Sequence, residues 1–116
     1  MFLKLNHQKL DSYGASRQFV LECYRLTKSL PMEEKFGMIT QIRRAALSVH
    51  LSLAEGSSTK SEVERKRYYE IARGSVIEID AAPDIAVDFA YLDGLNTESL
   101  GESMIRCFKI LTGLIK

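Results

Sequence analysis

Apolar residues recur along this chain at intervals of three and four, a spacing that predicts helices rather than strands. The first such run predicts a helix over residues 12–30, which Asp11 or Ser12 can cap and which Pro31 ends. Its core positions are four, three and four residues apart: Phe19, Cys23, Leu26 and Leu30.

A second run predicts a helix over residues 33–55. On a helical wheel, one stripe of this segment is apolar and predicts its core face. The members of the stripe are Met38, Ile39, Ile42, Ala45, Ala46, Val49 and Leu53. Gly56 follows the last apolar position and suits the left-handed residue that commonly ends a helix.

A third helix is predicted over residues 61–92. It opens on Ser61 and Glu64, which are spaced as a capping box. Pro83 falls inside it, and because the apolar pattern resumes in register afterwards, we expect a kink there rather than an end. The expected core face contains Tyr68, Ile71, Ala72, Ser75, Ile79, Ala82, Ala86 and Phe89.

Asp93 and Gly94 are expected to close that helix, and Asn96 or Thr97 to cap a fourth helix over residues 97–114. Its apolar positions are again four and three residues apart: Leu100, Met104, Cys107, Leu111 and Leu114. The short connections predict antiparallel neighbours. The sequence therefore predicts an all-α, up-down-up-down antiparallel four-helix bundle that occupies residues 1–116 as a single domain.

Composition narrows the setting of this domain. The two cysteines, Cys23 and Cys107, match no metal spacing and are expected to be buried thiols of a reducing compartment, with a disulfide as the alternative. The N-terminal stretch is short and polar, which predicts neither a signal peptide nor a membrane span. We therefore expect a cytoplasmic protein with no membrane partner.

Charge is segregated along the chain although the formal net charge is only +1. Residues 1–73 contain 13 Lys and Arg against 8 Asp and Glu. Residues 74–105 contain seven acids and no Lys or Arg. This segregation suggests complementary surfaces within or between chains, a basic face for a polyanion, or simply a solvated acidic face.

The second helix carries a second apolar strip, formed by Phe36, Leu47, Leu51 and Ala54. A helix with two apolar faces is too hydrophobic for one side of a monomeric bundle, so we expect Leu47 and Leu51 to contact another subunit. Arg43 and Arg44 lie near this strip. Their stems can pack on apolar neighbours while their guanidinium groups pair with carboxylates.

Counting outward from the expected turn at residues 56–60 gives each arginine a partner. Arg44 falls level with Gly74 and Ser75, one turn from Glu78, and we expect these two opposite charges to form a partly buried ion pair. Arg43 is expected to reach Asp80 of the same or a neighbouring chain. Contact with nucleic acid is the competing interpretation of both arginines.

Four segments together resemble the bacterial four-helix-bundle proteins encoded in intervening sequences of 23S ribosomal RNA genes. They are YRLTKSLP (24–31), EKFGMITQIRRAALSV (34–49), LAEGSSTKSEVER (53–65) and YYEIARGSVIEID (68–80). The same family includes accessory proteins of diversity-generating retroelements. The resemblance implies a cytoplasmic four-helix bundle that assembles as a ring-like homopentamer and associates with RNA or ribonucleoprotein.

Catalytic patterns are weak in this sequence. His7 and His50 have no Cys or Ser at a spacing that suggests a triad, and no glycine-rich phosphate loop or di-iron motif is present. We expect no enzymatic activity, cofactor or metal. The basic residues that could contact RNA cluster around the start of the third helix: Lys60, Arg65, Lys66, Arg67 and Arg73.

Two functions are compatible with these patterns. One is an oligomeric adaptor that binds RNA or ribonucleoprotein through the basic cluster. The other is an oligomeric scaffold that binds a protein partner without nucleic acid. Because Glu62, Glu64 and Glu70 interleave with the basic residues, a solvated face rich in ion pairs is the plainer interpretation of that cluster.

Overall fold

The computed structural model describes residues 2–116, which form an all-α protein. Two 3-10 turns and one π-helical turn are η1 (Asn6–Lys9), η2 (Met32–Glu34) and η3 (Lys35–Ile39). The long helices are α1 (Asp11–Lys28), α2 (Thr40–Ser58), α3 (Glu62–Asp88) and α4 (Glu98–Ile115). For the described residues, the prediction of an all-α fold with four long helices is confirmed.

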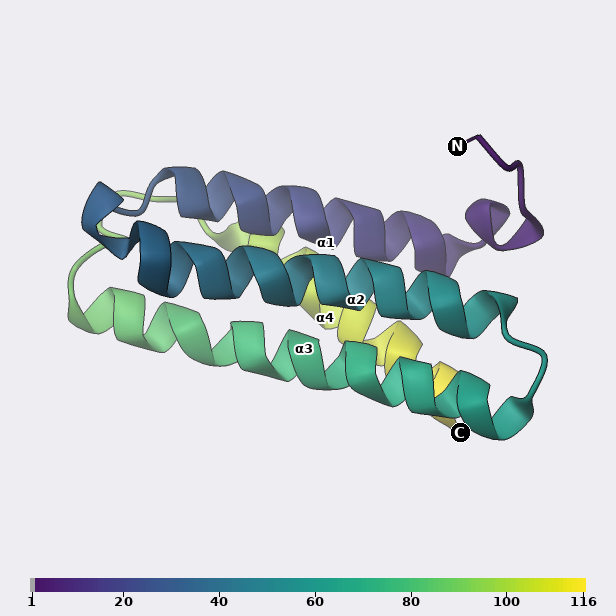
Figure 1. The fold of residues 1–116 in the computed structure, drawn as a ribbon. Coiled ribbons are helices and arrows are strands. Elements are labelled where there is room, and N and C mark those ends of the chain that lie inside the picture. The colour runs from purple at the N-terminus through teal and green to yellow at the C-terminus, as the bar shows by residue number, and fades with distance from the viewer. Residues whose placement is uncertain (1) are drawn as a thin grey trace.

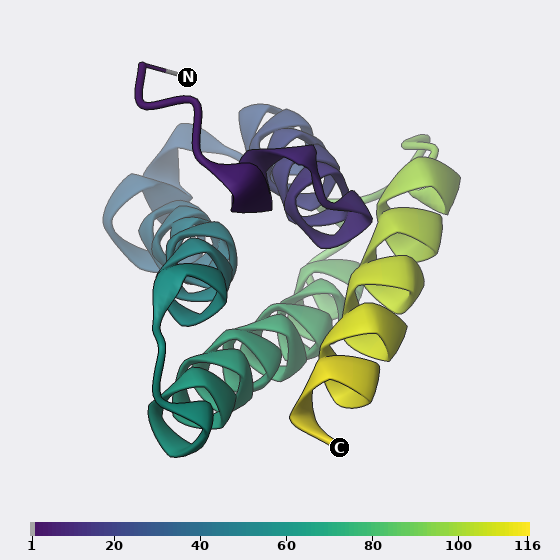
Figure 2. The same ribbon diagram turned by 90° about the vertical axis from the view of Figure 1, so that its right-hand side faces the viewer.

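Each long helix runs opposite to the one before it, so that the chain enters α1 and leaves α4 at the same end of the bundle (Figure 1). Viewed along the bundle, the helices surround a common core in chain order (Figure 2). Contacts join α1 to α2, α2 to α3, α3 to α4 and α4 back to α1. The bundle is therefore a closed arrangement in which each helix keeps an outward face.

The beginning of α1 differs from the prediction. The helix starts at Asp11 after Leu10, and no side chain caps it. Asp11 lies instead in the first turn, where a carboxylate interacts favourably with the positive end of the helix dipole. Ser12 is buried. Neither residue is the cap that we expected.

The regular part of the second helix starts later and ends later than the sequence pattern indicated. Residues 32–39 form the turns η2 and η3, and Gly37, inside η3, has non-helical backbone angles (φ −114°, ψ −106°) that kink the chain before α2. At the other end, α2 continues through Gly56 to Ser58. Gly56 is helical and buried, so its predicted role as a left-handed cap is wrong.

Gly56 serves packing instead. A Cβ atom at this position would lie 2.9 Å from Cε1 of Tyr69 and 3.0 Å from Cβ of Tyr68. Only glycine lets α2 approach α3 this closely. Glycine is a common sequence signal for both a helix end and a close approach, and the sequence alone did not separate the two.

Helix α3 continues through Pro83, as predicted, but it ends at Asp88 instead of residue 92. Its C-terminus is a Schellman motif, in which the Tyr91 amide donates to the Ala86 carbonyl and the Ala90 amide donates to the Val87 carbonyl. Ala90 occupies the left-handed position of this motif, at φ 60°. The sequence pattern does not indicate this helix end, because glycine is the usual residue at the left-handed position. Ser61 caps the start as predicted by accepting a hydrogen bond from the Glu64 amide.

The core confirms most of the predicted positions, including Phe19, Val49, Leu53 and Leu111. The main difference lies in α3, where the buried face is rotated by one residue at its beginning. Tyr69 is buried and Tyr68 only partly so, whereas Ile71 and Phe89, both predicted to be core residues, are exposed. Because α3 packs against both α2 and α4, its buried face lies between the directions of these two neighbours.

Candidate interaction surfaces

Arg43 belongs to the contact between α1 and α2. Its Nε donates a hydrogen bond to Oγ1 of Thr27 (2.8 Å), and its guanidinium lies 4.7 Å from the centre of the Tyr24 ring. These contacts combine a hydrogen bond to a buried hydroxyl with a cation–π interaction. The predicted pairing of Arg43 with Asp80 is not found among the ion pairs of residues 2–116.

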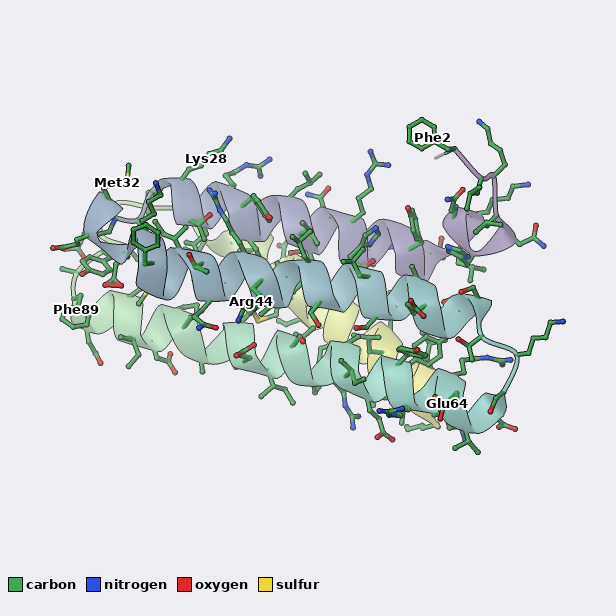
Figure 3. All side chains as sticks on the ribbon, viewed as in Figure 1. Phe2, Lys28, Met32, Arg44, Glu64 and Phe89 are labelled. Atoms are coloured by element: carbon green, nitrogen blue, oxygen red, sulfur yellow. The ribbon has the colours of Figure 1, made fainter. Side chains whose placement is uncertain are left out.

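Arg44 points elsewhere because successive residues of an α-helix are about 100° apart. It is exposed on the outer surface of α2 (Figure 3), and Glu78 is exposed on α3. No ion pair joins them in the part of the chain that the structure describes. The prediction of a partly buried pair is therefore wrong, since both charges remain in contact with water.

The contact between α2 and α3 uses hydroxyl groups where we expected charge. Oγ of Ser75 donates to Oγ of Ser48 at 3.1 Å, which places these two residues level with each other. The register expected from the sequence places Ser75 level with Arg44. The observed partner, Ser48, is one helical turn further along α2. The shift arises because α2 extends past Gly56 to Ser58 before the chain turns.

The second apolar strip of α2 is exposed, as the helical wheel predicts. Leu47 and Leu51 both lie open to solvent, and 58% of Leu51 is accessible. Phe36, in the turn before α2, is exposed as well, and Ala54 is partly so. The strip is therefore an apolar surface that the bundle itself does not cover.

The predicted basic cluster is divided between local structure and solvent. Arg65 closes the α2–α3 connection, because its guanidinium donates to the carbonyl groups of Thr59 and Lys60, each at 3.2 Å. Arg73 reaches across to α4, where it donates to Oγ1 of Thr112 at 3.5 Å. These two arginines therefore have structural roles.

Lys66 and Arg67 form ion pairs within α3. The Lys66 ammonium lies 3.6 Å from the carboxylate of Glu62, and the Arg67 guanidinium lies 3.5 Å from that of Glu64. Exposed pairs of this kind contribute little to stability. Lys66 and Arg67 can therefore exchange these partners for an external anion at small cost.

The structure also brings together His50 and Ser16, which are far apart in the sequence. Nδ1 of His50 lies 2.7 Å from Oγ of Ser16, and the imidazole lies 4.6 Å from the Tyr13 ring, centre to centre. Burial lowers the pKa of His50, and the nearby charges of Arg17 and His7 lower it further. Because Ser16 is fully buried, this pair fits a packing role and not that of an accessible nucleophile.

Glu22 is a second polar group that the sequence pattern did not reveal. Only 6% of this residue is exposed, and its Oε1 accepts hydrogen bonds from Gln18 (3.0 Å) and Arg25 (2.7 Å). It lies on α1, beside two grooves that α1 forms with α4 and with the chain preceding α4. Glu22 follows Gln18 by four residues and precedes Arg25 by three, and this spacing in the sequence indicates that the three side chains can contact one another on a helix.

Both cysteines are buried free thiols, as predicted, and no disulfide joins them. Burial raises the pKa of Cys23 to about 12 and that of Cys107 to about 11. Such thiols are poor nucleophiles at neutral pH. Within residues 2–116, no group of three or more His, Cys, Asp or Glu side chains is arranged to hold a metal ion.

An apolar groove about 260 Å³ in volume runs between α3 and α4. Its lining is largely apolar, with one acidic and one basic side chain: Val76, Ile77, Asp80, Met104, Ile105, Phe108 and Lys109. Ile77 and Ile105 are more than half exposed along it. The exposed strip of α2 and this groove are thus two apolar surfaces on different helices of the bundle.

Comparison with known proteins places this arrangement in a family. Residues 8–113 match the model of the 23S rRNA-intervening sequence protein family. Since the match spans nearly the whole chain, the protein belongs to this family. No curated protein matches the chain with significant similarity. No helix among residues 2–116 is both long and apolar enough to cross a lipid bilayer.

Proposed function

We propose that this member of the 23S rRNA-intervening sequence protein family is a non-enzymatic, self-associating adaptor of the cytoplasm. It assembles as a homo-oligomer, a pentamer as the family resemblance implies, and the assembled form binds RNA or ribonucleoprotein. The observation that carries the proposal is the exposed apolar strip of α2, where Leu47 and Leu51 face solvent on a helix whose opposite face is already buried. Such a surface is typical of an interface between proteins.

Self-association is tested by replacing the two leucines. Light scattering behind a sizing column is expected to give several times the chain mass of 13.1 kDa for the native protein, and about 13.1 kDa for the Leu47→Asp/Leu51→Asp variant. Val63→Asp is the matched control, because Val63 is 78% exposed at the start of α3, away from the strip. A native protein that remains monomeric at micromolar concentration contradicts the proposal.

Repetition of a weak cationic surface supports the RNA-binding part of the proposal. Lys60, Lys66 and Arg67 lie around the α2–α3 connection and the first turns of α3, at one end of the bundle. In an oligomer each copy contributes the same side chains, and linked contacts raise the overall affinity without new chemistry. Each phosphate that they neutralise also steepens the dependence of binding on salt.

A titration with structured RNA at about 50 and 200 mM salt tests this part. Replacing Lys66 and Arg67 with Ser is expected to flatten the salt dependence, while Arg65 is retained because it holds the α2–α3 connection. Lys28→Ser/Lys35→Ser removes the same charge near the opposite end of the bundle and serves as the control (Figure 3). Equal effects of the two double changes contradict a specific role for the start of α3.

The second candidate is a scaffold that binds a protein partner without nucleic acid. The engagement of Arg65 and Arg73 in intramolecular hydrogen bonds favours it, since these contacts remove two of the five predicted phosphate ligands. An oligomer that persists while no RNA binds at 50 mM salt is the outcome that selects this candidate.

A further inference from the structure

The groove between α3 and α4 is lined by one basic and one acidic side chain, Lys109 of α4 and Asp80 of α3. Arg73 of α3 donates to Thr112 of α4, which sets these residues level with each other. Lys109 precedes Thr112 by three residues in the antiparallel helix, so it lies level with Val76. Asp80, which lines the groove, follows one turn along α3, about 6 Å from the level of Val76 at 1.5 Å per residue. Asp84 lies one turn beyond the groove lining, about 12 Å from that level.

The apolar strip of α2 has a matching arrangement of charge. Arg44 precedes Leu47 and Leu51, and Glu55 follows them, at successive spacings of three, four and four residues. All four therefore share one face of α2. Arg44 and Glu55 are about 16 Å apart along the axis of α2. Their long side chains can bridge the difference from the roughly 12 Å between the levels of Asp84 and Lys109.

The charges at both surfaces are available. Arg44, Glu55, Asp80, Asp84 and Lys109 are all exposed. None of them forms an ion pair with another residue in the range 2–116. The exposed apolar residues between them, Leu51 on α2 and Ile105 on α4, are accessible to 58% and 57%. The strip and the groove thus complement each other in both hydrophobicity and charge.

We propose that the α2 strip of one copy docks into the α3–α4 groove of the next, with Arg44 at Asp80 and Asp84 and with Glu55 at Lys109. This inference rests on the self-association proposed above and names the surface that receives the strip. The charge order makes the docked α2 antiparallel to the α3 that receives it, which is also how α2 runs against α3 within its own chain (Figure 1).

All copies therefore point in the same direction. Because the two contacting surfaces are different, the interface is heterologous, and repeating it generates a ring if the rotation closes. A two-fold dimer in which two strips pack antiparallel on each other would instead pair Arg44 with Glu55 and Leu47 with Leu51 of the other copy, and it would leave the groove empty.

Two single substitutions distinguish these arrangements. Leu51→Asp disrupts the strip and leaves the groove intact, whereas Ile105→Asp disrupts the groove and leaves the strip intact. Each variant alone is expected to be monomeric in light scattering. Mixed in equal amounts at high micromolar concentration, they are expected to form one intact interface and give a heterodimer of about twice the 13.1 kDa chain mass. Val63→Asp is the control that keeps the native oligomer.

The outcomes separate this inference from the proposed function. If Ile105→Asp remains fully oligomeric while Leu51→Asp is monomeric, self-association stands and the groove is not its surface. If both variants are monomeric but never combine, the two residues do not face each other, and the inference is also wrong. A monomeric native protein removes both proposals together.

Charge reversal tests the polarity of the contact. Glu55→Lys and Lys109→Glu are each expected to weaken assembly by about tenfold or more in dissociation constant, because each places two like charges together. The double variant restores the opposite-charge pair and is expected to recover most of the native affinity. Additive weakening in the double variant contradicts the pairing of Glu55 with Lys109.

Discussion

Gly56 offers the sharpest test of how α2 and α3 pack. Replacing glycine by alanine inside a helix normally stabilises it by about 1 kcal/mol, because alanine loses less conformational freedom on folding. At Gly56, however, the new methyl group would lie 2.9 Å from Cε1 of Tyr69 and 3.0 Å from Cβ of Tyr68. The Tyr69 ring cannot turn away freely, because it is buried and its hydroxyl lies 3.2 Å from Oγ of Ser57.

Overpacking of this kind costs about 1–3 kcal/mol, which offsets or exceeds the gain in helix propensity. We therefore expect Gly56→Ala to change the free energy of unfolding by between zero and about −2 kcal/mol. Gly74→Ala is the matched control, since α3 leaves the space around Gly74 open for 4 Å, and it is expected to stabilise by about 1 kcal/mol.

Urea denaturation measures both changes, and a difference of about 2 kcal/mol corresponds to about 1 M in the midpoint for a slope near 2 kcal/mol/M. In a Tyr69→Leu background the clash with the ring is removed, so Gly56→Ala is expected to become less destabilising or stabilising. Equal stabilisation by Gly56→Ala and Gly74→Ala in the native background would refute the close-approach argument.

Three further predictions concern single side chains. Arg43→Ala is expected to destabilise the bundle by about 1–2 kcal/mol, because the hydrogen bond and the cation–π contact of Arg43 are lost. Arg44→Ala is expected to destabilise it by less than about 0.5 kcal/mol in the same urea titration. Equal effects of the two changes contradict the assigned roles. Ala90→Gly is expected to raise the free energy of unfolding by about 0.5–1 kcal/mol, because glycine relieves the left-handed strain, and a loss of stability would count against that reasoning. The pKa of His50 is lowered in the folded state, so its contribution to stability is present above the unfolded pKa of about 6.5 and is lost as the pH falls through the lowered value. His50→Gln is therefore expected to weaken the pH dependence of the melting temperature between about pH 7 and 5. An unchanged pH profile would contradict this.

Most of the fold could be predicted from the sequence, because a four-helix bundle is encoded by periodicity alone. The stripe from Ile42 to Leu53 and the run from Leu100 to Leu111 are both buried as expected. Helix ends were harder, because their signals are ambiguous. Gly56 is a residue type that commonly ends helices, but here it is a packing contact inside α2. Ala90 occupies the left-handed position that ends α3, although alanine is not typical there.

The interaction surfaces could be predicted only in part. The strip containing Leu47 and Leu51 can be predicted from the helical wheel, because it depends only on the spacing of residues within one helix. The partners of the two arginines depend on the register between helices, which shifted by about one turn when α2 extended to Ser58. A shift of this size makes a predicted ion pair wrong, because the charged atoms must lie within a few ångströms of each other.

The two arginines also show why adjacent residues can have unrelated roles. Their positions on α2 differ by about 100°, so one guanidinium packs on Tyr24 of α1 while the other faces solvent. The presence of arginine at both positions therefore does not indicate that the two residues share a function. In the proposed assembly Arg44 contacts another copy, whereas Arg43 contacts α1 of its own chain.

The interior of the folded chain does not depend on the proposed assembly. Among residues 2–116, every buried side-chain nitrogen and oxygen atom has a hydrogen-bond partner within the chain, and a single apolar cluster joins all four helices. The subunit therefore needs no second copy to satisfy its interior. Leu51 and Ile105 lie outside that cluster, so replacing either with aspartate removes apolar surface that only another molecule can cover. Loss of the oligomer with unchanged helical content is then evidence about the interface and not about the stability of the bundle.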